Sequence, residues 1–532
     1  RYANRSIPST RASAHGRGPS TEMPSPRTIL IAGTASHVGK STVTTGLCHL
    51  LETAGLSVAP YKAQNMSNEA RVVLRSPPLG DPPFGEIGVA QTIQAEAAGR
   101  TPTTDMNPVL LKPQGEGHSR LIIDGIATEA VAAGAYYTDH WHTARDHALA
   151  AYDRLAADAE VIIAEGAGSI AEMNLQHRDL ANIELARHAD AEIILVADIE
   201  RGGVFAQVVG TVALMPEDLR DQLIGIIITK FRGDPALFTA GRTMLEAEVG
   251  VDVLGVIPHT AIPLPDEDSL SYPGMETELR GDVDAPEAVE IAVPRLPRAA
   301  NTADLDPLRR TPGVVLRFLP PDGRLGDPDA VVLTGTKNTV DDMHELEAGG
   351  LAAQLRQYEG PLLGICGGYQ LLGERLTDPG HESPTGGRSV RGLGRLPVET
   401  HFTAGKRIKP VTCQYAGDSI LGATDATVAG YAIHRGQTRA TGPLATPFSD
   451  GEADPITLGA AAGRVCGTYL HGLFENAAIR SGFLSQLFMH AGVDRPARAS
   501  GPTTTDGITV ASRLLAETAV PQLFGIADIV QG

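Results

Sequence analysis

Short runs of apolar residues alternate with longer amphipathic segments from residue 28 to about residue 262. Four of the runs, TILIAG, VIIAEG, EIILVAD and LIGIIIT, have the length and continuity of buried parallel strands. Segments between them, such as STVTTGLCHLLETAG and DLANIELARHA, carry apolar residues at helical spacing. Strands that alternate with helices in this way predict an α/β fold with a doubly wound parallel sheet.

A second series of the same kind follows the segment PLPDEDSLSYPGMETELRGDVDAPE, which is rich in proline, glycine and acidic residues. The runs VEIAVPRL, GVVLRFL, AVVLTG, PLLGIC and RVCGTYLHG predict the strands of another α/β sheet. The two series share no internal repeat and carry different motifs. We therefore predict a first domain over residues 28–262, a linker over residues 263–287 and a second domain over residues 288–532.

The segment that precedes the first predicted strand differs in composition from the rest of the chain. Residues 1–27 contain five arginines and one acidic residue, are rich in serine and proline, and follow no period. Such a composition predicts a disordered tail. The segment lacks the amphipathic apolar face of a transit peptide, so we interpret it as an upstream extension in which Met23 is a candidate natural start.

Length, charge and cysteine content narrow the class of protein. A chain of 532 residues is too long for one ordinary domain. Its net charge of −19 argues against a protein that coats nucleic acid or anionic membrane, and no apolar run reaches the roughly 20 residues that span a bilayer. Four cysteines without a CxxC pair exclude a disulfide framework and fit a reducing compartment. The sequence predicts a cytoplasmic protein whose partners are small molecules, and it leaves the oligomeric state open.

A nucleotide site is predicted where the first strand meets the first helix. The stretch ILIAGTASHVGKSTVTTG has the strand, glycine-containing loop, Gly-Lys-Ser and helix of a P-loop. Backbone N–H groups and the helix N-terminus would face the phosphates, Lys40 would reach the β- and γ-phosphates, and Ser41 would hold Mg²⁺. The first glycine, Gly33, lies one residue ahead of the standard position, which Thr34 occupies. The predicted nucleotide-binding residues are Gly33, Thr34, Ser36, Gly39, Lys40, Ser41 and Lys230.

Three further loops lie at the same predicted sheet edge, where open α/β sheets bind their ligands. Glu165 ends the strand VIIAEG and is a candidate Mg²⁺ ligand, the alternative being a solvated acid at a strand end. Thr229 and Lys230, in IIITKFRGD, are polar groups at the end of a predicted strand and are candidate contacts for the base. The loop VAPYKAQNMSNEA brings Lys62, Gln64 and Asn65 to this edge, and we predict that they bind the substrate. Spacing alone does not separate that interpretation from an ordinary surface loop.

A candidate nucleophile lies in the second series, in the stretch GICGGYQLLGE. The G-x-C-x-G pattern resembles the strand–nucleophile–helix turn of hydrolases, with Cys366 in place of serine. Glycines suit this turn because side chains there would clash and because the backbone is strained. The N-terminus of the following helix favours the thiolate, which is the reactive form. We predict that the N–H groups of Gly367 and Gly335 stabilise the oxyanion.

A general base is also required. The run RVCGTYLHGLFEN ends a strand with His471, and nucleophile and base need only be close in space. His434, in GYAIHRGQ, competes for this role. Cys48, Cys413 and Cys466 lie inside helix or strand patterns and are predicted to be small core residues.

The combination of the two sites suggests a coupled reaction. Attack of a thiolate on a carboxamide releases ammonia and leaves an acyl-enzyme. ATP at the other site can convert a carboxylate into an acyl phosphate, which ammonia then displaces. The sum is an amide-forming ligase that consumes ATP and glutamine.

Several long motifs identify the chain as similar to the cobyric acid synthase family. They are GTASHVGKS, VAPYKAQNMS, TDMNPVLLKP, EGAGSIAEMNL, DIERGGVFAQ, TKFRGD, TGTKNT, GICGGYQ and GTYLHGLFEN. The resemblance runs from residue 28 to about residue 490. It implies a P-loop parallel-sheet synthetase domain that resembles dethiobiotin synthetase, followed by an α/β class I glutamine amidotransferase domain. The pair KAQNMS and MNPVLLKP favours this family over the related cobyrinic acid a,c-diamide synthases.

The resemblance implies amidation of the b, d, e and g carboxylates of adenosylcobyrinic acid a,c-diamide, with ATP and Mg²⁺ as cofactors and one glutamine consumed for each amide. It implies Cys366 as the nucleophile and His471 as its base. Many glutamine amidotransferases place a glutamate two residues after the histidine, where this chain and the family have Leu473, so no full triad is predicted. The chain departs from the family pattern at Ala432, where the family usually has glutamate, and at Thr229, where it usually has asparagine.

Two alternatives remain at this point. A ligase of the same architecture could act on another polyacid, which would leave both predicted sites unchanged. A P-loop regulator could use nucleotide as a switch without ligating anything. The cysteine turn in GICGGYQ argues against the regulator, because a switch protein has no need of a nucleophile there.

Overall fold

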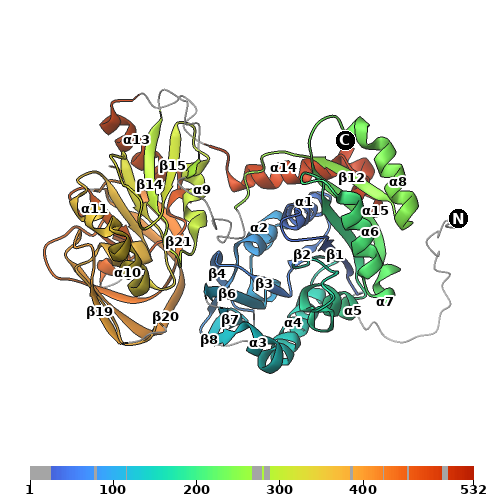
Figure 1. The fold of residues 1–532 in the computed structure, drawn as a ribbon, viewed down its shortest axis with the longest axis horizontal. Helices are drawn as coiled ribbons and strands as arrows, with labels where there is room; N and C mark the ends of the chain where they lie inside the picture. The colour runs from blue at the N-terminus through green and yellow to red at the C-terminus, as the bar shows by residue number, and fades with distance from the viewer. Residues whose placement is uncertain are drawn as a thin grey trace.

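The computed structural model has two α/β lobes, with the N-terminal lobe in blue and green and the second in yellow and orange in Figure 1. The structure describes residues 25–76, 81–115, 117–265, 278–280, 288–383, 387–417, 419–422, 425–451, 454–493 and 501–531. Most of the predicted tail and most of the predicted linker lie outside the described residues. No helix within those ranges is both long and apolar enough to cross a membrane.

A six-stranded sheet forms the centre of the first domain. All of its neighbouring strands are parallel. In spatial order the strands are β12 (Val253–Pro258), β11 (Leu223–Phe231), β10 (Glu192–Asp198), β1 (Arg27–Gly33), β9 (Val161–Glu165) and β2 (Val58–Tyr61). The four apolar runs predicted as strands are β1, β9, β10 and β11, and their continuous apolar character reflects burial on both faces of the sheet.

Helices cover both faces of this sheet, as the doubly wound pattern predicts. The helices of the first domain are α1 (Lys40–Thr53), α2 (Val89–Ala97), α3 (Ala133–Ala135), α4 (Trp141–Ala156), α5 (Leu185–Ala189), α6 (Val204–Leu214), α7 (Glu217–Arg220) and α8 (Thr239–Val249), and the short α3 lies beside β7 (His118–Ile123) and β8 (Ile126–Ala132). The carboxyl ends of β1, β9 and β11 lie at one edge of the sheet and carry the predicted nucleotide-site residues.

A smaller β layer extends from the first domain toward the second (Figure 1). One part is a four-stranded sheet, and the other is an antiparallel hairpin. The sheet consists of β3 (Gln64–Met66), β6 (Val109–Gly115), β7 (His118–Ile123) and β8 (Ile126–Ala132), and the hairpin of β4 (Ala70–Leu74) and β5 (Phe84–Gly88). The apolar pattern of the sequence did not predict this layer, which contacts the second domain.

The second domain has a seven-stranded sheet whose central strands are parallel. Its strands are, in order, β13 (Glu278–Arg280), β15 (Val314–Leu319), β14 (Val289–Pro294), β16 (Ala330–Leu333), β17 (Leu362–Ile365), β24 (Val465–Thr468) and β23 (Gly459–Ala462). A separate sheet contains β19 (Arg388–Arg391), β18 (Arg375–Asp378), β20 (Val398–Tyr415) and β21 (Ala426–Ala440), with β22 (Phe448–Ser449) beside β20. The helices are α9 (Asp306–Arg309), α10 (Thr339–Gly349), α11 (Leu351–Gln357), α12 (Gly367–Leu372) and α13 (Ala477–Ala491).

The C-terminal helices return to the first domain, as the red segment beside α1 in Figure 1 shows. They are α14 (Thr504–Ala516), α15 (Val520–Leu523) and α16 (Ala527–Gln531). Helix α14 packs directly on α1, where a Cβ atom added to Gly46 would lie only 2.6 Å from the carbonyl oxygen of Ala511. Ile508 and Leu515 belong to the same apolar core as Ile29 of β1.

This packing differs from the predicted division, which placed all of residues 288–532 in the second domain. An amphipathic helix reveals that one of its faces is buried, but its periodicity does not say against which neighbour. The described part of the chain therefore assigns residues 504–531 to the core of the first domain.

Candidate functional site

The predicted phosphate loop joins the end of β1 to the start of α1. Gly39 precedes the helix with a positive φ of 97°, a conformation that favours glycine. The ammonium of Lys40 donates hydrogen bonds to the carbonyl oxygens of Ala35 and Gly168, each at 2.9 Å. A Cβ atom on Gly33 would lie 2.9 Å from that ammonium nitrogen. The early glycine therefore leaves room for the lysine side chain to fold back under the loop.

Glu165 is buried at the end of β9, next to the start of α1. Its Oε1 atom accepts hydrogen bonds from Ser41 Oγ and Lys62 Nζ, both at 2.9 Å. Its Oε2 atom accepts one from Gln94 Nε2 at 2.5 Å. The Lys62 ammonium balances the charge of this carboxylate, which is 1% exposed. Gln94 was missed by the sequence analysis, because a glutamine inside a helix carries no distinguishing pattern.

The oxygen donors of Ser41 and Glu165 are of the type that Mg²⁺ prefers. Within the described residues, no three His, Cys, Asp or Glu side chains form a cluster that could enclose a metal. Mg²⁺ characteristically binds one or two carboxylates and completes its coordination with phosphates and water. The donor set therefore fits a magnesium ion that arrives with a nucleotide.

Most of the predicted first-domain residues line one cleft at this edge of the sheet. They are Ser36, Gly39, Lys40, Ser41, Lys62, Asn65, Glu165 and Lys230. Lys230 Nζ donates to the carbonyl oxygen of His37 at 2.7 Å and pairs with Asp198 at 2.9 Å. The loop residues, the candidate base contact and two of the three predicted substrate residues thus face the same space.

Gly33, Thr34 and Gln64 are placed differently. Gly33 lies beneath the loop, and Thr34 is buried with its backbone N–H bonded to the carbonyl of Val196 at 3.0 Å. Gln64 accepts a hydrogen bond from the Tyr136 hydroxyl at 2.5 Å. Asn65 lines the cleft, whereas Gln64 points toward Tyr136 in the turn before α4.

Cys366 occupies the sharp turn between β17 and α12. Its φ of 54° and ψ of −108° are strained for any residue other than glycine. A Cβ atom on Gly364 would lie 2.5 Å from the carbonyl of Gly368, and one on Gly368 would overlap Leu333. The glycines on either side are therefore required for the chain to place this cysteine at the turn. The other three cysteines are buried in helix and strand interiors, as predicted.

His471 is held next to Cys366 by an aspartate that the sequence analysis missed. Its Nδ1 atom lies 2.6 Å from Asp304 Oδ2, and the other carboxylate oxygen accepts from the Gly472 N–H at 2.8 Å. The side chains of Cys366, His471 and Asp304 are all buried. Burial lowers the pKa of His471, but the charges of Asp304 and Cys366 outweigh it and raise the pKa to about 10. The second domain thus contains a Cys–His–Asp arrangement.

Asp304 supplies the carboxylate beside His471, although it does not follow the histidine in the sequence. It belongs to the short 3₁₀ helix η7 (Thr302–Leu305), far from His471 along the chain. Leu473, two residues after His471, is completely buried and apolar. No local pattern links Asp304 to His471, because their proximity arises only in the folded domain.

His434 lies near the same site but does not have the geometry of the base. Its ring stacks on Tyr469 with centroids 3.7 Å apart, and its Nδ1 atom bonds to the carbonyl of Gly436 at 2.8 Å. Burial lowers the pKa of His434 to about 3. His471 is the histidine that the carboxylate of Asp304 orients, so the structure favours it as the partner of Cys366.

The two predicted oxyanion residues lie beside the nucleophile. A Cβ atom on Gly335 would lie 3.2 Å from the His471 ring and 3.7 Å from the Cys366 Cβ atom. A Cβ atom on Gly367 would lie 2.5 Å from the side chain of Thr336. The loop after β16 and the start of α12 therefore meet at the cysteine, which leaves a stabilising role for these glycines as a prediction.

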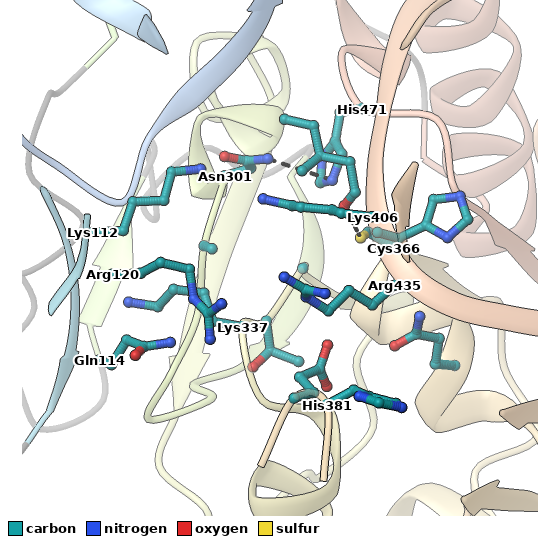
Figure 2. A pocket seen from close by; sticks show the side chains of 17 residues that line it. Lys112, Gln114, Arg120, Asn301, Lys337, Cys366, His381, Lys406, Arg435 and His471 are labelled. Atoms are coloured by element: carbon teal, nitrogen blue, oxygen red, sulfur yellow. Dashed lines mark hydrogen bonds between the residues drawn. The ribbon is translucent and has the colours of Figure 1, made fainter. Parts of the chain in front are cut away.

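The pocket in front of Cys366 is formed by both domains. Figure 2 shows Lys112 and Arg120 reaching it from β6 and β7 of the first domain, opposite Cys366 and His471. Its cationic side chains are Lys112, Arg120, Lys337, Lys406 and Arg435. Lys112 and Lys406, one from each domain, both pair with the buried carboxylate of Glu86. The first domain thus completes the wall of the pocket in front of Cys366.

Comparison with known proteins assigns a different protein family to each of the two domains. Residues 29–267 match the family described as the CobQ/CobB/MinD/ParA nucleotide binding domain, and residues 290–479 match the CobB/CobQ-like glutamine amidotransferase domain. The chain is 54% identical over 484 residues to the probable cobyric acid synthase of Halobacterium salinarum, covering 90% of this chain and 93% of that protein. This chain belongs to the cobyric acid synthase family. Two other similar members are the probable cobyric acid synthase of Methanococcoides burtonii, 45% identical (88% and 90% covered), and the cobyric acid synthase of Acaryochloris marina, 42% identical (86% and 90% covered).

Membership of the cobyric acid synthase family confirms the predicted order of domains, an ATP-binding domain followed by a glutamine amidotransferase domain. It also confirms the predicted class of enzyme, a glutamine-dependent amide ligase.

Two departures from the usual cobyric acid synthase pattern have clear structural positions. Thr229 donates hydrogen bonds to the carbonyl oxygens of Val38 and Ala197, at 2.7 and 3.2 Å, and its methyl group lies beneath Gly39. It therefore supports the phosphate loop from below. Ala432 is buried in β21, two residues before His434.

Proposed function

We propose that the enzyme amidates the b, d, e and g carboxylates of adenosylcobyrinic acid a,c-diamide and so forms adenosylcobyric acid. Each amide would consume one ATP and one glutamine. The observation that carries this proposal is that one chain of the cobyric acid synthase family holds both a phosphate loop and a Cys–His–Asp centre. The proposed place of action is the cytoplasm, since the four cysteines are unpaired.

The second domain would release ammonia from glutamine. The Cys366 thiolate attacks the carboxamide carbon, and protonated His471 gives its proton to the departing nitrogen. Ammonia leaves, and a glutamyl thioester remains on Cys366. His471 then accepts a proton from water as that water attacks the thioester, which yields glutamate and the free thiol. Asp304 holds the imidazole in the required orientation and stabilises its positive charge.

The first domain would activate the acceptor carboxylate. Lys40 and the backbone N–H groups of the loop bind the phosphates of ATP, while Ser41 and Glu165 would hold Mg²⁺. When bound, Mg²⁺ would neutralise charge on the phosphates. A carboxylate of the corrinoid attacks the γ-phosphorus, which gives ADP and an acyl phosphate. Ammonia displaces phosphate from that carbonyl carbon and forms the amide.

Lys62 and Asn65 would bind the acceptor, because they line the cleft beside the phosphate loop. The position of Gln64, turned toward Tyr136, gives it an indirect role in holding β3. A single activation site that serves four carboxylates requires the substrate to rebind or turn between steps. Partly amidated intermediates should therefore accumulate during the reaction.

Mass spectrometry tests the proposal. Adenosylcobyrinic acid a,c-diamide is incubated with the enzyme, glutamine, ATP and Mg²⁺. We expect stepwise conversion of four carboxylates to carboxamides, with ADP, phosphate and glutamate formed in proportion. An unchanged corrinoid mass, with a working glutaminase, would show that the acceptor is another polyacid.

A further inference from the structure

One segment of the first domain makes buried contacts with the glutaminase machinery. It is residues 67–70, which follow β3. Glu69 Oε1 accepts hydrogen bonds from the N–H and hydroxyl groups of Thr302, at 3.0 and 2.9 Å, and its Oε2 atom accepts from the Ala303 N–H at 3.1 Å. The next residue, Ala70, donates its N–H to Asn301 Oδ1 at 3.2 Å. Glu69 and Ala70 are 1% exposed, so the carboxylate is shielded from water and bound to the start of η7.

The element that Glu69 holds is the one that orients His471. Asp304 lies in η7, one residue after Ala303, and bonds to His471 Nδ1. Asn301, just before η7, lies with its Nδ2 atom 3.4 Å from His471 Nε2, the contact drawn as a dashed line in Figure 2. Both ring nitrogens of the catalytic histidine are thus contacted by residues that a first-domain segment fixes in place.

The residues just before this segment line the nucleotide cleft. Lys62, Asn65 and Met66 line that cleft, and Met66 is only three residues before Glu69. Asn65 is tied to α2 through Gln91 at 3.1 Å, and the Ser67 N–H bonds to the carbonyl of Leu111 at 3.1 Å. The chain between the cleft and Glu69 is therefore short, and hydrogen bonds at Asn65 and Ser67 fix its position.

We propose that residues 62–70 couple the two sites, with Glu69 as the positioning residue that sets the Asp304–His471 pair according to occupancy of the nucleotide cleft. Lys62 pairs with Glu165 in this structure, and the phosphates and acceptor carboxylate of the proposed reaction compete for its ammonium. A shift of Lys62 and β3 is transmitted through Glu69 to η7. Ammonia is then released fastest when a carboxylate is ready to receive it.

Burial makes Glu69 suited to this role. Desolvation raises the pKa of Glu69 to about 7, against the opposing effect of its bonds to Ala303 and Thr302. The carboxylate therefore depends on those bonds, and a neutral amide at this position would present an N–H₂ group to one of the backbone N–H donors of η7. Glu69→Gln keeps the size of the side chain and disturbs only its hydrogen bonds to Thr302 and Ala303.

The inference rests on the proposed glutaminase and ligase activities, and its test separates the two. Release of glutamate is measured in the full chain with and without ATP, Mg²⁺ and adenosylcobyrinic acid a,c-diamide. Amidation driven by ammonium chloride is measured in parallel, and hydrogen exchange reports on residues 301–305. For Glu69→Gln we expect the stimulated glutaminase rate to fall about ten- to a hundredfold, because small misplacements of catalytic groups cost that much. The KM for glutamine and the ammonia-driven rate should stay within about twofold of the wild type, while the amides of Thr302 and Ala303 exchange faster.

Glu475→Gln is the matched control. It weakens the ion pair of Glu475 with Arg71 across the same interface, but Glu475 has no bond to η7. Its stimulation by ATP and acceptor should equal that of the wild type. The proposal is overturned if the wild-type glutaminase ignores occupancy of the cleft, if Glu69→Gln retains full stimulation, or if its ammonia-driven rate falls in parallel. A wild-type enzyme without glutaminase or amidation would instead refute the proposed function.

Discussion

In the first domain, Gly33, Lys40 and Ser41 come from a single strand, loop and helix, and all three lie within a stretch of nine residues. In the second domain, Asp304, Cys366 and His471 come from three distant segments that meet only after the sheet has formed. A phosphate can be bound by local backbone geometry, because a helix N-terminus supplies its donors together. Attack by a thiolate, with proton transfer to the leaving nitrogen, needs side chains of three different kinds at fixed distances, so tertiary packing has to assemble them.

The two sites can be separated most sharply by removing the nucleophile. Cys366→Ala should lower glutamine-driven amidation by about 10⁵- to 10⁶-fold, as losses of nucleophiles in hydrolytic triads do. Amidation with ammonium chloride should continue, because activation of the carboxylate occurs in the other domain. Glutamate release and corrinoid mass are the two measurements. Loss of both activities would place Cys366 in the synthetase reaction and contradict the assignment.

The contribution of the distant aspartate can be measured next. Asp304→Asn should lower the glutaminase kcat by about 10³- to 10⁴-fold, since an amide no longer favours the correct tautomer or charge of His471. The KM for glutamine and the ammonia-driven reaction should change little.

The two histidines near Cys366 can be compared by replacing each with alanine. The first variant is His434→Ala and the second is His471→Ala. The glutaminase loss of the first variant should be much smaller than that of the second, because His434 bonds to Gly436 and not to a carboxylate. The opposite ranking of the two histidines would show that the base has been misassigned.

The local site can be tested with Lys40→Ala. Loss of the ammonium should lower amidation about 10²- to 10³-fold, comparable to the loss of one transition-state donor. The loss should be the same with glutamine and with free ammonia, in contrast to Cys366→Ala. Rates with both nitrogen sources, and the binding of ATP by calorimetry, would measure it. Full activity with ammonia would disprove the phosphate-binding role.

The smallest expected effect concerns the contact between α1 and the C-terminal helix α14. Gly46→Leu places a side chain where α1 meets Ala511 of α14, and overpacking of this kind costs about 1–3 kcal/mol in the free energy of unfolding. Thermal and urea denaturation would report the change. Gly210→Ala in α6 is the control, because a Cβ atom there would have no other atom within 4 Å. This substitution should be neutral or stabilising. Gly55→Ala is not suitable, because Gly55 has a positive φ.

The residues that the sequence identified share a local signature. Lys40 and Ser41 follow a strand and open a helix, and Cys366 lies in a glycine-rich turn that few other functions require. The buried strands were recognisable for a similar reason, because continuous apolar runs bounded by glycine are typical of parallel sheets. These features depend on neighbours along the chain.

The features that escaped prediction depend on neighbours in space. Asp304 is an ordinary acidic residue until η7 packs beside His471, and Gln94 is an ordinary helical residue until α2 meets Glu165. Lys112 and Arg120 reach Cys366 only because the first domain's β layer lies against the second domain. Gln64 turns toward Tyr136, 72 residues later in the chain, and no local pattern in the sequence specifies that contact.

The return of α14 to the first domain affects the order in which the protein can be completed during synthesis. Residues 504–531 leave the ribosome after the whole of the second domain, yet they pack on α1 at Gly46 and share its apolar core. That surface must stay open, or be protected by a chaperone, while several hundred later residues are made, since domains otherwise tend to fold in order as they emerge. The two catalytic domains are thus joined twice, and neither is finished until translation has passed through both.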